Sequence, residues 1–327
     1  MAKKKEEPTS EDILESLEKK YGLDRVDPGE LTIVSTGCLM LDEVTDIGGT
    51  ALGKMIEISG ENSCGKSTTS LHQMAEYQKA FPERKVAYFD YEHSFDMAYA
   101  KKIGVDVDNL LIYQPDYQEQ GYDMILGLIE KELVSCVVID SQTAAAPKAI
   151  VDGEMSDATI SLQARINSKF CLKVKGMLDR HKVTLFVISQ LRANIGAMSG
   201  EQNITTGGKG FTFYADMRWK VWKFNDKTNE LNKTTIDVIK NKLGKPFGSA
   251  KVDILWGVGF DKVGELIDYA AEFKLITKAA AGWYTIGETK VQGMDAVKEF
   301  MEDNPEYFES MKQQVLTKLK EKNEGKD

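Results

Sequence analysis

Hydrophobic and polar residues alternate along the chain with two different periods, and the two periods predict strands and helices in turn. Short apolar runs rich in β-branched residues are typical of strands, whereas apolar residues three and four positions apart are typical of one helix face. Such strand runs occupy residues 31–34, 55–58, 86–89, 110–113, 136–139 and 184–188, and helix patterns occupy residues 10–22, 68–80, 120–133 and 162–181. Because buried strands that alternate with helices form parallel sheets, these patterns predict an α/β fold with a mostly parallel central sheet covered on both faces.

The pattern changes beyond residue 217. Residues 217–224, 234–239 and 252–256 alternate in polarity and are joined by polar turns, which predicts antiparallel strands that extend the sheet. From about residue 264 we expect a small α/β domain with a strand at 283–286 and helices that begin near Met294 and Pro305. The predicted domains are therefore residues 1–30, 31–263 and 264–327.

The N-terminal segment, residues 1–30, carries an amphipathic helix followed by a linker. The helix has one apolar stripe, and Gly22 ends it. The stripe must be covered, either by the protein's own core or by a neighbouring subunit, and the residues alone leave both alternatives open. The stripe consists of Ile13, Leu14, Leu17 and Tyr21.

Composition limits the class of protein. The chain of 327 residues has 42% hydrophobic and 28% charged residues, as soluble globular proteins do. It contains no apolar run long enough to span a membrane, and its first residues lack the apolar core of a signal peptide. Four cysteines without paired spacing indicate neither a zinc site nor a disulfide framework, so we expect a reducing cytoplasm. A net charge of −9 disfavours a nonspecific nucleic-acid coat but leaves room for a local basic groove.

A glycine-bounded loop between a predicted strand and a predicted helix has the pattern of a phosphate-binding loop. Gly60 and Gly65 let the backbone turn its N–H groups inward, and the helix N-terminus adds partial positive charge. Lys66 is suited to the β- and γ-phosphates of ATP, and the Ser67 hydroxyl to Mg²⁺. The predicted nucleotide-binding residues of this segment are Gly60, Glu61, Asn62, Ser63, Cys64, Gly65, Lys66, Ser67 and Thr68.

Three further polar residues end apolar strands. Asp140 follows the run 136–139, the form of a carboxylate that holds Mg²⁺ beside a phosphate loop. No Glu adjoins Asp140, so the base that orients the attacking water must come from another strand. Glu92 follows the run 86–89 and is the candidate base, because strand carboxyl ends converge on the ligand crevice. Gln190 ends the run 184–188 and is an uncharged donor suited to sensing a γ-phosphate.

Residues 191–210 form a long segment rich in Gly, Asn, Thr and Ser without an apolar period. Loops of this length inside a compact domain are usually functional or disordered. Gly207, Gly208 and Lys209 offer backbone N–H groups and one cation to a nucleic-acid phosphate. An ordinary surface loop is the alternative.

Together these motifs resemble the bacterial RecA recombinase family over residues 31–319. The shared stretches include STGCLMLD, GENSCGKST, FDYEH, VVIDS, ISQLR, TTGG, KNK and GELID. The resemblance implies a RecA-like P-loop ATPase core with a small N-terminal helix-strand segment for polymerisation and a small α/β C-terminal domain.

The resemblance also assigns nucleotide-site residues. It implies that Glu92 activates water and that Gln190 links the γ-phosphate to a DNA loop. Asp96 and Tyr99 match the adenine site. Lys240 and Lys242 would reach the ATP of the neighbouring protomer and neutralise charge on the transferring phosphoryl group.

Two DNA-binding loops follow from the same resemblance. The first matches residues 152–161 and the helix after it, and the second matches residues 192–213, with Ile160 and Ile195 as wedges between stretched base groups. The implied DNA-binding residues are Ile160, Arg165, Ser168, Arg192, Asn194, Ile195, Thr206, Gly207, Gly208 and Lys209.

The implied function is a DNA-dependent ATPase that forms helical filaments on single-stranded DNA and catalyses homologous pairing with duplex DNA and strand exchange, in recombination and DNA repair. Its cofactors would be ATP and Mg²⁺, its partners both forms of DNA and further copies of itself, with no membrane. Lys278, Lys290 and Lys298 are candidates for gathering duplex DNA. Two alternatives are a ring-forming helicase on the same ATPase core and a scaffold that binds ATP and single-stranded DNA without hydrolysis.

Overall fold

The computed structural model describes residues 9–23, 25, 29–154, 161–193, 203–205, 207–224 and 231–324. Contacts divide the chain into two units, Met1–Thr32 and Ile33–Asp327. Among the described helices, none combines the length and the apolar character needed to cross a lipid bilayer.

The first unit contains helix α1 (Ser10–Tyr21), as its apolar spacing predicts. Thr9 caps the helix, since its side-chain oxygen accepts from Asp12 N at 3.2 Å while Asp12 Oδ2 accepts from Thr9 N at 2.8 Å. None of the helix residues, all of which the structure describes, is buried. Ile13, Leu14 and Leu17 are 42–49% exposed, so this unit by itself leaves the apolar stripe uncovered.

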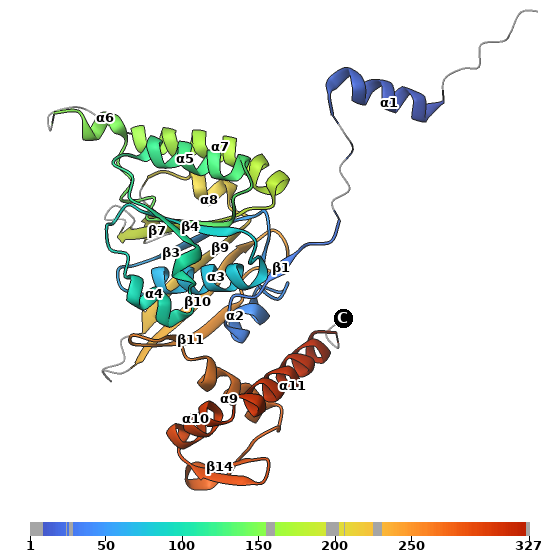
Figure 1. Ribbon diagram of the computed structural model, residues 1–327, viewed down its shortest axis with the longest axis vertical. Helices are drawn as coiled ribbons and strands as arrows, with labels where there is room; N and C mark the ends of the chain where they lie inside the picture. The colour runs from blue at the N-terminus through green and yellow to red at the C-terminus, as the bar shows by residue number, and fades with distance from the viewer. Residues whose placement is uncertain are drawn as a thin grey trace, which may run out of the picture. The chain divides into compact units, whose positions relative to one another are not determined.

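A large sheet organises the second unit (Figure 1). Its order is β12-β11-β10-β9-β3-β7-β6-β4-β5, and β8 pairs with β7 beside this path. The strands are β3 (Met55–Gly60), β4 (Lys85–Asp90), β5 (Leu110–Tyr113), β6 (Val134–Asp140), β7 (Thr184–Ala193), β8 (Asn203–Thr205), β9 (Met217–Phe224), β10 (Leu231–Asn241), β11 (Ser249–Leu255) and β12 (Gly259–Phe260).

Strand directions divide this sheet into two parts. Strands β5, β4, β6, β7, β3 and β9 are parallel to their neighbours, whereas β9, β10, β11 and β12 pair antiparallel. The predicted α/β class, the mostly parallel sheet and its antiparallel extension are therefore confirmed. Each strand predicted from residue 55 to residue 256 overlaps an observed one.

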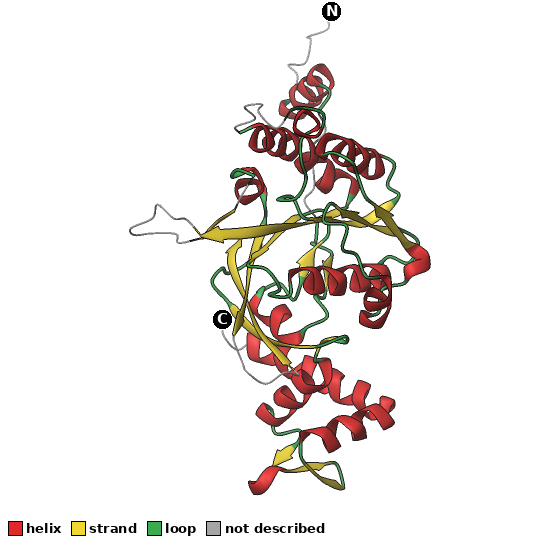
Figure 2. Ribbon diagram, turned by 90° about the vertical axis from the view of Figure 1, so that its left-hand side faces the viewer, coloured by secondary structure: helices red, strands yellow, loops and turns green. Residues whose placement is uncertain are grey.

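Helices cover both faces of the sheet, as Figures 1 and 2 show. On β7, Phe186 and Ile188 join the core cluster under α3, while Leu185 and Val187 join the cluster under α5 and α7. Alternate residues of β7 therefore pack against opposite helix layers. Both faces of the strand are buried, which explains why residues 184–188 are almost all apolar. One layer holds α3 (Lys66–Ala80) and α4 (Met97–Ile103), and the other holds α5 (Gln118–Glu130), α7 (Leu162–His181) and α8 (Gly210–Tyr214).

Several short elements lie between the main helices and strands along the chain. The predicted strand at 31–34 is reduced to β1, which pairs with β2 in a separate two-stranded sheet. These elements are β1 (Ile33–Val34), α2 (Leu39–Val44), β2 (Thr50–Ala51), the 3-10 helix η1 (Val107–Asn109) and α6 (Lys148–Val151).

The C-terminal part has its own hydrophobic core, which includes Leu266, Ile286 and Val315. The predicted strand and both predicted helices are present, but the structure adds α9 and two strands that flank β14. The sequence analysis missed these strands because β13 has two residues and β15 contains one apolar residue, so neither shows an apolar period. The elements are α9 (Lys262–Glu272), β13 (Thr277–Lys278), the 3-10 helix η2 (Ala280–Gly282), β14 (Trp283–Ile286), β15 (Thr289–Gln292), α10 (Met294–Asp303) and α11 (Pro305–Glu324).

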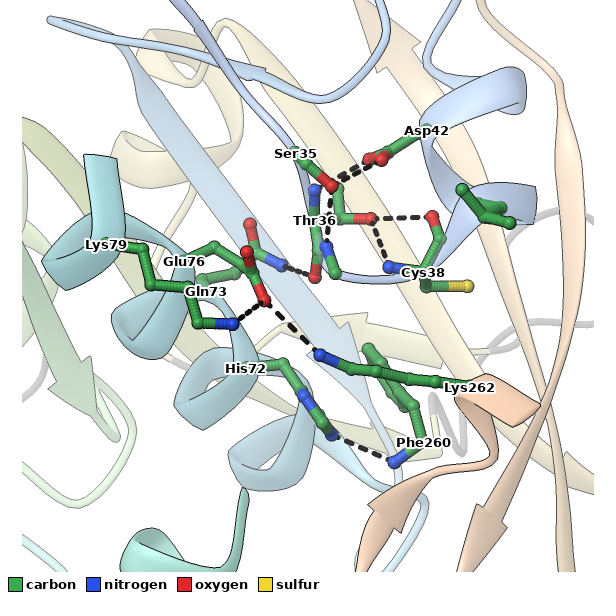
Figure 3. A network of polar contacts seen from close by, with 12 residues as sticks. Ser35, Thr36, Cys38, Asp42, His72, Gln73, Glu76, Lys79, Phe260 and Lys262 are labelled. Atoms are coloured by element: carbon green, nitrogen blue, oxygen red, sulfur yellow. Dashed lines mark hydrogen bonds and ion pairs between the residues drawn. The ribbon is translucent and has the colours of Figure 1, made fainter. Parts of the chain in front are cut away.

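A polar network fastens α3 to the segment before α2 and to the start of α9 (Figure 3). His72 stacks on Phe260 with ring centroids 3.9 Å apart, and its Nε2 accepts from Phe260 N at 2.9 Å. Gln73 Nε2 donates to Thr36 O at 2.9 Å. Lys262 Nζ lies 3.3 Å from Glu76 Oε1. These contacts fix the helix that begins at the phosphate loop.

Asp42, a partly buried residue of α2, receives hydrogen bonds from the same segment before α2. Asp42 accepts from Ser35 Oγ at 2.5 Å and from Thr36 N at 2.6 Å. Burial raises the pKa of Asp42 to about 7, although both hydrogen bonds act in the opposite direction.

Candidate active site

The register of the parallel strands gathers four predicted site residues at one edge of the sheet. Gly60 at the end of β3 pairs with Gln190 on β7, and Asp90 at the end of β4 pairs with Asp140 on β6. Glu92 follows Asp90 by two residues. Because parallel strands end on the same side, separate sequence motifs meet here.

The phosphate loop turns from β3 directly into α3. Gly65 is the N-cap of α3 with φ +99°, a conformation that favours glycine. Gly60 has no space for a side chain, since a Cβ there would lie 2.3 Å from Val221 O. Lys66 is 8% exposed, and its Nζ donates to Glu61 O at 2.5 Å. Because Gly65 is the N-cap, α3 begins at Lys66, two residues earlier than its apolar spacing predicts.

Ser67 and Asp140 form the oxygen pair suited to Mg²⁺. Ser67 Oγ donates to Asp140 Oδ2 at 2.7 Å, and Tyr88 OH donates to the same oxygen at 2.5 Å. Burial raises the pKa of Asp140, and these two hydrogen bonds oppose the rise. Within the described residues no cluster of three His, Cys, Asp or Glu could hold a metal alone. One hydroxyl and one carboxylate fit Mg²⁺, which takes its remaining ligands from phosphates and water.

Glu92 lies in a tight turn that Asp90 holds. Asp90 accepts from Ser94 N at 3.2 Å and from Phe95 N at 3.1 Å, so the turn after β4 closes on its last strand residue. Glu92 Oε1 accepts from Ser141 Oγ at 2.6 Å and from Gln190 Nε2 at 2.6 Å. The candidate base and the candidate γ-phosphate sensor are thus in direct contact.

Gln190 connects this contact to the second loop. Its backbone N donates to Thr143 Oγ1 at 3.1 Å. Strand β7 continues past Gln190 to Ala193 and pairs antiparallel with β8, where Arg192 lies opposite Ile204. The strand that carries the sensor therefore enters the predicted DNA-binding loop without interruption.

The two residues of the predicted adenine site lie at the start of α4. Asp96 is the N-cap of α4 and accepts from Tyr99 N at 3.0 Å. Tyr99 OH lies 3.1 Å from Thr68 Oγ1 on the first turn of α3. The cap thus holds the Tyr99 ring against the phosphate-loop helix.

Lys240 and Lys242 lie far from the phosphate loop of their own chain. Thr234 Oγ1 on β10 donates to Cys64 O at 3.5 Å, so that end of β10 lies beside the loop. At about 3.3 Å per strand residue, Lys240 is about 20 Å further along. Lys240 Nζ donates to Thr212 O at 3.0 Å, and Lys242 Nζ lies 3.7 Å from Asp216 Oδ1. Burial and nearby cations lower the pKa of Lys240.

Several predicted DNA-binding residues gather where α7 meets α8. Arg165 and Ser168 lie on α7, and a Cβ on Gly208 would lie 2.5 Å from Ala164 Cβ on the same helix. Arg165, Arg192 and Lys209 are exposed. Ile160, Asn194, Ile195 and Thr206 lie outside the described residues.

Of the three C-terminal lysines, Lys278 and Lys290 are exposed. Lys298 Nζ instead lies 2.5 Å from Asp261 Oδ2.

Family comparisons match nearly the whole chain. The family model described as RecA N-terminal domain matches residues 10–261, and the one described as RecA C-terminal domain matches residues 264–320. The chain belongs to the RecA family. RecA proteins are recombinases of DNA recombination and repair, and the family is known as one of DNA-dependent ATPases that bind nucleotide with a metal and form filaments on DNA.

Individual RecA proteins are similar over most of their length. Protein RecA of Streptomyces venezuelae is 39% identical over 294 residues, which cover 88% of this chain and 77% of that protein. Protein RecA of Aquifex pyrophilus is 39% identical over 314 residues, covering 92% and 89%. Protein RecA of Lactiplantibacillus pentosus is 37% identical over 313 residues, covering 92% and 82%.

The sequence analysis missed three side chains of this RecA site: Tyr88, Ser141 and Thr143. Ser141 and Thr143 contact Glu92 and Gln190, and Tyr88 contacts Asp140. The position of Ser141 and Thr143 directly after the strand-end carboxylate was an available signal. The inward direction of Tyr88 required the three-dimensional structure.

Proposed function

We propose that this protein is a DNA-dependent ATPase that assembles on single-stranded DNA, pairs it with homologous duplex DNA and exchanges strands. The observation that carries the proposal is the hydrogen bond between Gln190 and Glu92 at the sheet edge where the phosphate loop begins. Glu92, the proposed base, contacts Gln190, the proposed sensor. Gln190 lies on β7, which enters the proposed DNA-binding loop, so DNA bound to that loop can change the rate of hydrolysis.

The nucleotide is ATP with Mg²⁺. Lys66 and the N–H groups at the start of α3 bind the phosphates, and Ser67 with Asp140 holds the metal. When bound, Mg²⁺ neutralises charge on the phosphate oxygens. Glu92 orients and polarises the attacking water, and Gln190 donates to the γ-phosphate. Asp96 and Tyr99 form the adenine side of the site.

The active site is completed across a junction between copies. Lys240 and Lys242 are too far from their own phosphate loop to act there, since about 20 Å of strand separates Lys240 from it. In an assembly they reach the phosphates of the neighbouring copy and stabilise developing charge. Hydrolysis then requires polymerisation.

We assign subunit contact to residues 1–30, nucleotide and DNA binding to residues 31–263, and a small α/β domain to residues 264–327. The uncovered stripe of α1 supports the first assignment, because an amphipathic helix gains stability by burying that face. Lys278 and Lys290 support duplex capture by the third.

DNA binds along the face where α7 meets the second loop. Arg165 and Lys209 supply cations and Gly207 and Gly208 supply backbone N–H groups, a set that binds phosphates without reading sequence. Base pairing then provides the specificity.

We place the protein in the cytoplasm. All four cysteines are described, buried and free, which suits a reducing compartment.

The decisive experiment measures ATP hydrolysis with and without poly(dT), together with electron microscopy of the product. We expect hydrolysis that depends on poly(dT) and open helical filaments. Closed rings would indicate the helicase alternative, and ATP-dependent DNA binding without turnover would indicate the scaffold. Full hydrolysis by an unassembled protein without DNA would refute the proposal.

A further inference from the structure

A buried amide network joins the base of the second loop to the segment that holds the catalytic pair. Asn167 Nδ2 on α7 donates to Gly207 O at 2.7 Å and to Gln142 Oε1 at 2.9 Å. Asn167 is 0% exposed and Gln142 is 1% exposed. Hydrogen bonds between groups buried this completely keep one arrangement, because a buried amide without its hydrogen-bond partner destabilises the protein.

The Asn167 side chain uses its whole hydrogen-bonding capacity. Its Oδ1 accepts from Gln118 Nε2 at 2.5 Å and from Tyr122 OH at 2.7 Å, both on α5. A carboxamide offers two donor hydrogens and one acceptor oxygen with two lone pairs, so no capacity remains. The Gly207 carbonyl can only accept, which fixes the orientation of the amide.

Gln142 lies within a three-residue segment that contacts both catalytic candidates. Ser141 Oγ donates to Glu92, and Thr143 Oγ1 accepts from Gln190 N. Between them, Gln142 N donates to Ile188 O at 3.0 Å on the strand that carries Gln190. A shift of Gln142 therefore moves the residues that position the base and the sensor.

The loop base is in close contact with this network. Gly207 has φ +85°, and a Cβ there would lie 2.5 Å from Gln142 Oε1 and 2.9 Å from Asn167 Nδ2. The backbone of Gly207 thus rests directly on the two amides. Movement of this backbone either carries both amides with it or breaks the hydrogen bond to Asn167.

We infer that Asn167 is a positioning residue for ATP hydrolysis, which transmits the arrangement of the second DNA loop through Gln142 to Glu92 and Gln190. This inference rests on the proposed function, since it requires that DNA stimulates hydrolysis. It adds a second connection to the direct one along β7. Asn167 touches neither nucleotide nor DNA in this scheme and acts only through its neighbours.

The test compares Asn167→Asp with Tyr122→Phe in the full-length protein. Asn167→Asp keeps the shape and the oxygen that accepts from Gln118 and Tyr122 but replaces the donor to Gly207 and Gln142. Tyr122→Phe removes one hydrogen bond from the same network and leaves both donors in place. Each variant is assayed for hydrolysis with and without poly(dT), and for the affinity of a non-hydrolysable ATP analogue under both conditions.

We expect Asn167→Asp to lose about tenfold or more of the stimulation by poly(dT), with the DNA-free rate and the separate affinities for DNA and analogue within about threefold of wild type. The factor by which poly(dT) tightens analogue binding should fall in parallel, because coupling between two ligands is reciprocal. Tyr122→Phe should keep its stimulation within about threefold. A purely structural role would lower both variants together and leave the affinity ratio unchanged.

Wild-type stimulation in Asn167→Asp would overturn the inference, as would an equal loss in both variants. If Asn167→Asp does not fold, Gln142→Leu cuts the same connection from the other side, and wild-type stimulation in that variant would also overturn it. A wild-type protein that poly(dT) does not stimulate would instead refute the proposed function itself.

Discussion

Gln190 donates from its side-chain nitrogen to Glu92 Oε1 at 2.6 Å, although 98 positions separate the two residues in the chain. Ser141 Oγ donates to the same carboxylate oxygen at 2.6 Å. Two neutral donors therefore hold the carboxylate at the edge of the sheet where the phosphate loop begins. This fixed orientation supports the proposal that Glu92 directs the attacking water.

Glu92→Gln should bind ATP and DNA but lose about 100-fold or more of its DNA-dependent hydrolysis, because the amide keeps the shape and loses the basic oxygen. Steady-state ATPase and filter binding to poly(dT) would measure the two properties. Glu130→Gln, a change at an exposed carboxylate on α5, is the matched control. Normal turnover in Glu92→Gln would remove Glu92 from its proposed role.

Lys66→Ala should weaken nucleotide binding and ATP-dependent assembly together, since the buried ammonium is the only cation of the phosphate loop itself. We expect the affinity for ATP to fall about 100-fold, as the loss of a charged hydrogen bond to phosphate implies. Titration with a fluorescent ATP analogue measures this. Lys79→Ala, at an exposed position of the same helix, should bind the analogue like wild type. Unchanged affinity in Lys66→Ala would show that phosphates bind elsewhere.

Lys242→Ala should depress hydrolysis by about 100-fold while each copy still binds ATP, because in the proposed assembly the lysine acts on the neighbour's nucleotide. Its side chain is 47% exposed and only loosely paired with Asp216, so removal should leave the fold intact. Lys245→Ala is the control, since that side chain is 81% exposed. When Lys242→Ala is mixed with wild type, the ATPase activity should fall by more than the decrease in the wild-type fraction. Activity that falls only in proportion to the wild-type fraction would argue against donation across the junction.

Leu17→Glu should weaken assembly without altering the stability of the ATPase core. Leu17 belongs to the uncovered stripe of α1. Burial of one leucine contributes about 2 kcal/mol, so each junction should weaken by about 30-fold. Light scattering with ATP and poly(dT) reports filament length, and Glu15→Gln on the same helix is the control. Filaments of normal length from Leu17→Glu would exclude the stripe from the junction.

Asp42→Asn should change how stability depends on pH. The pKa of Asp42 is raised to about 7 in the folded protein, above its ordinary value of 3.8. The folded state therefore binds the proton more tightly, so this group's stabilisation is complete below pH 3.8 and is lost as the pH rises through about 7. Asparagine keeps the contacts to Ser35 and Thr36 without the charge. Because the loss of stabilisation begins near pH 3.8 and continues to about pH 7, we expect the stability advantage of Asp42→Asn over wild type to be about 2 kcal/mol larger at about pH 8 than at about pH 5.

Urea unfolding at both pH values measures this difference. A constant difference in unfolding free energy between Asp42→Asn and wild type at the two values would contradict the assignment. Ser35→Ala should instead lower stability most at high pH, because it removes a hydrogen bond that favours the charged form.

The sequence by itself determined the elements that depend on near neighbours in the chain. The apolar periods predicted β5, α7, β9 and β14 to the residue, because burial on one or both faces imposes those periods wherever the element lies. The phosphate loop was equally readable, since one short segment supplies its glycines, its lysine and the start of its helix.

The sequence also predicted that the carboxyl ends of the parallel strands lie at one edge of the sheet, because parallel pairing alone requires it. The prediction that Glu92, Asp140 and Gln190 lie on the same side of the sheet agrees with the structure. Direct contact between Gln190 and Glu92 depends on the register of β3 with β7 and of β4 with β6, which no local pattern encodes.

Only the tertiary structure decided which side chains hold this site in place. Ser141 and Thr143 offered only their position after Asp140 as a sequence signal, and Asn167 offered none, because a hydroxyl or an amide is common in turns and on helices alike. Their importance arises from packing that leaves each with a single set of partners away from water. Such contacts join residues far apart in the chain, and their geometry exists only once the helices have closed over the sheet.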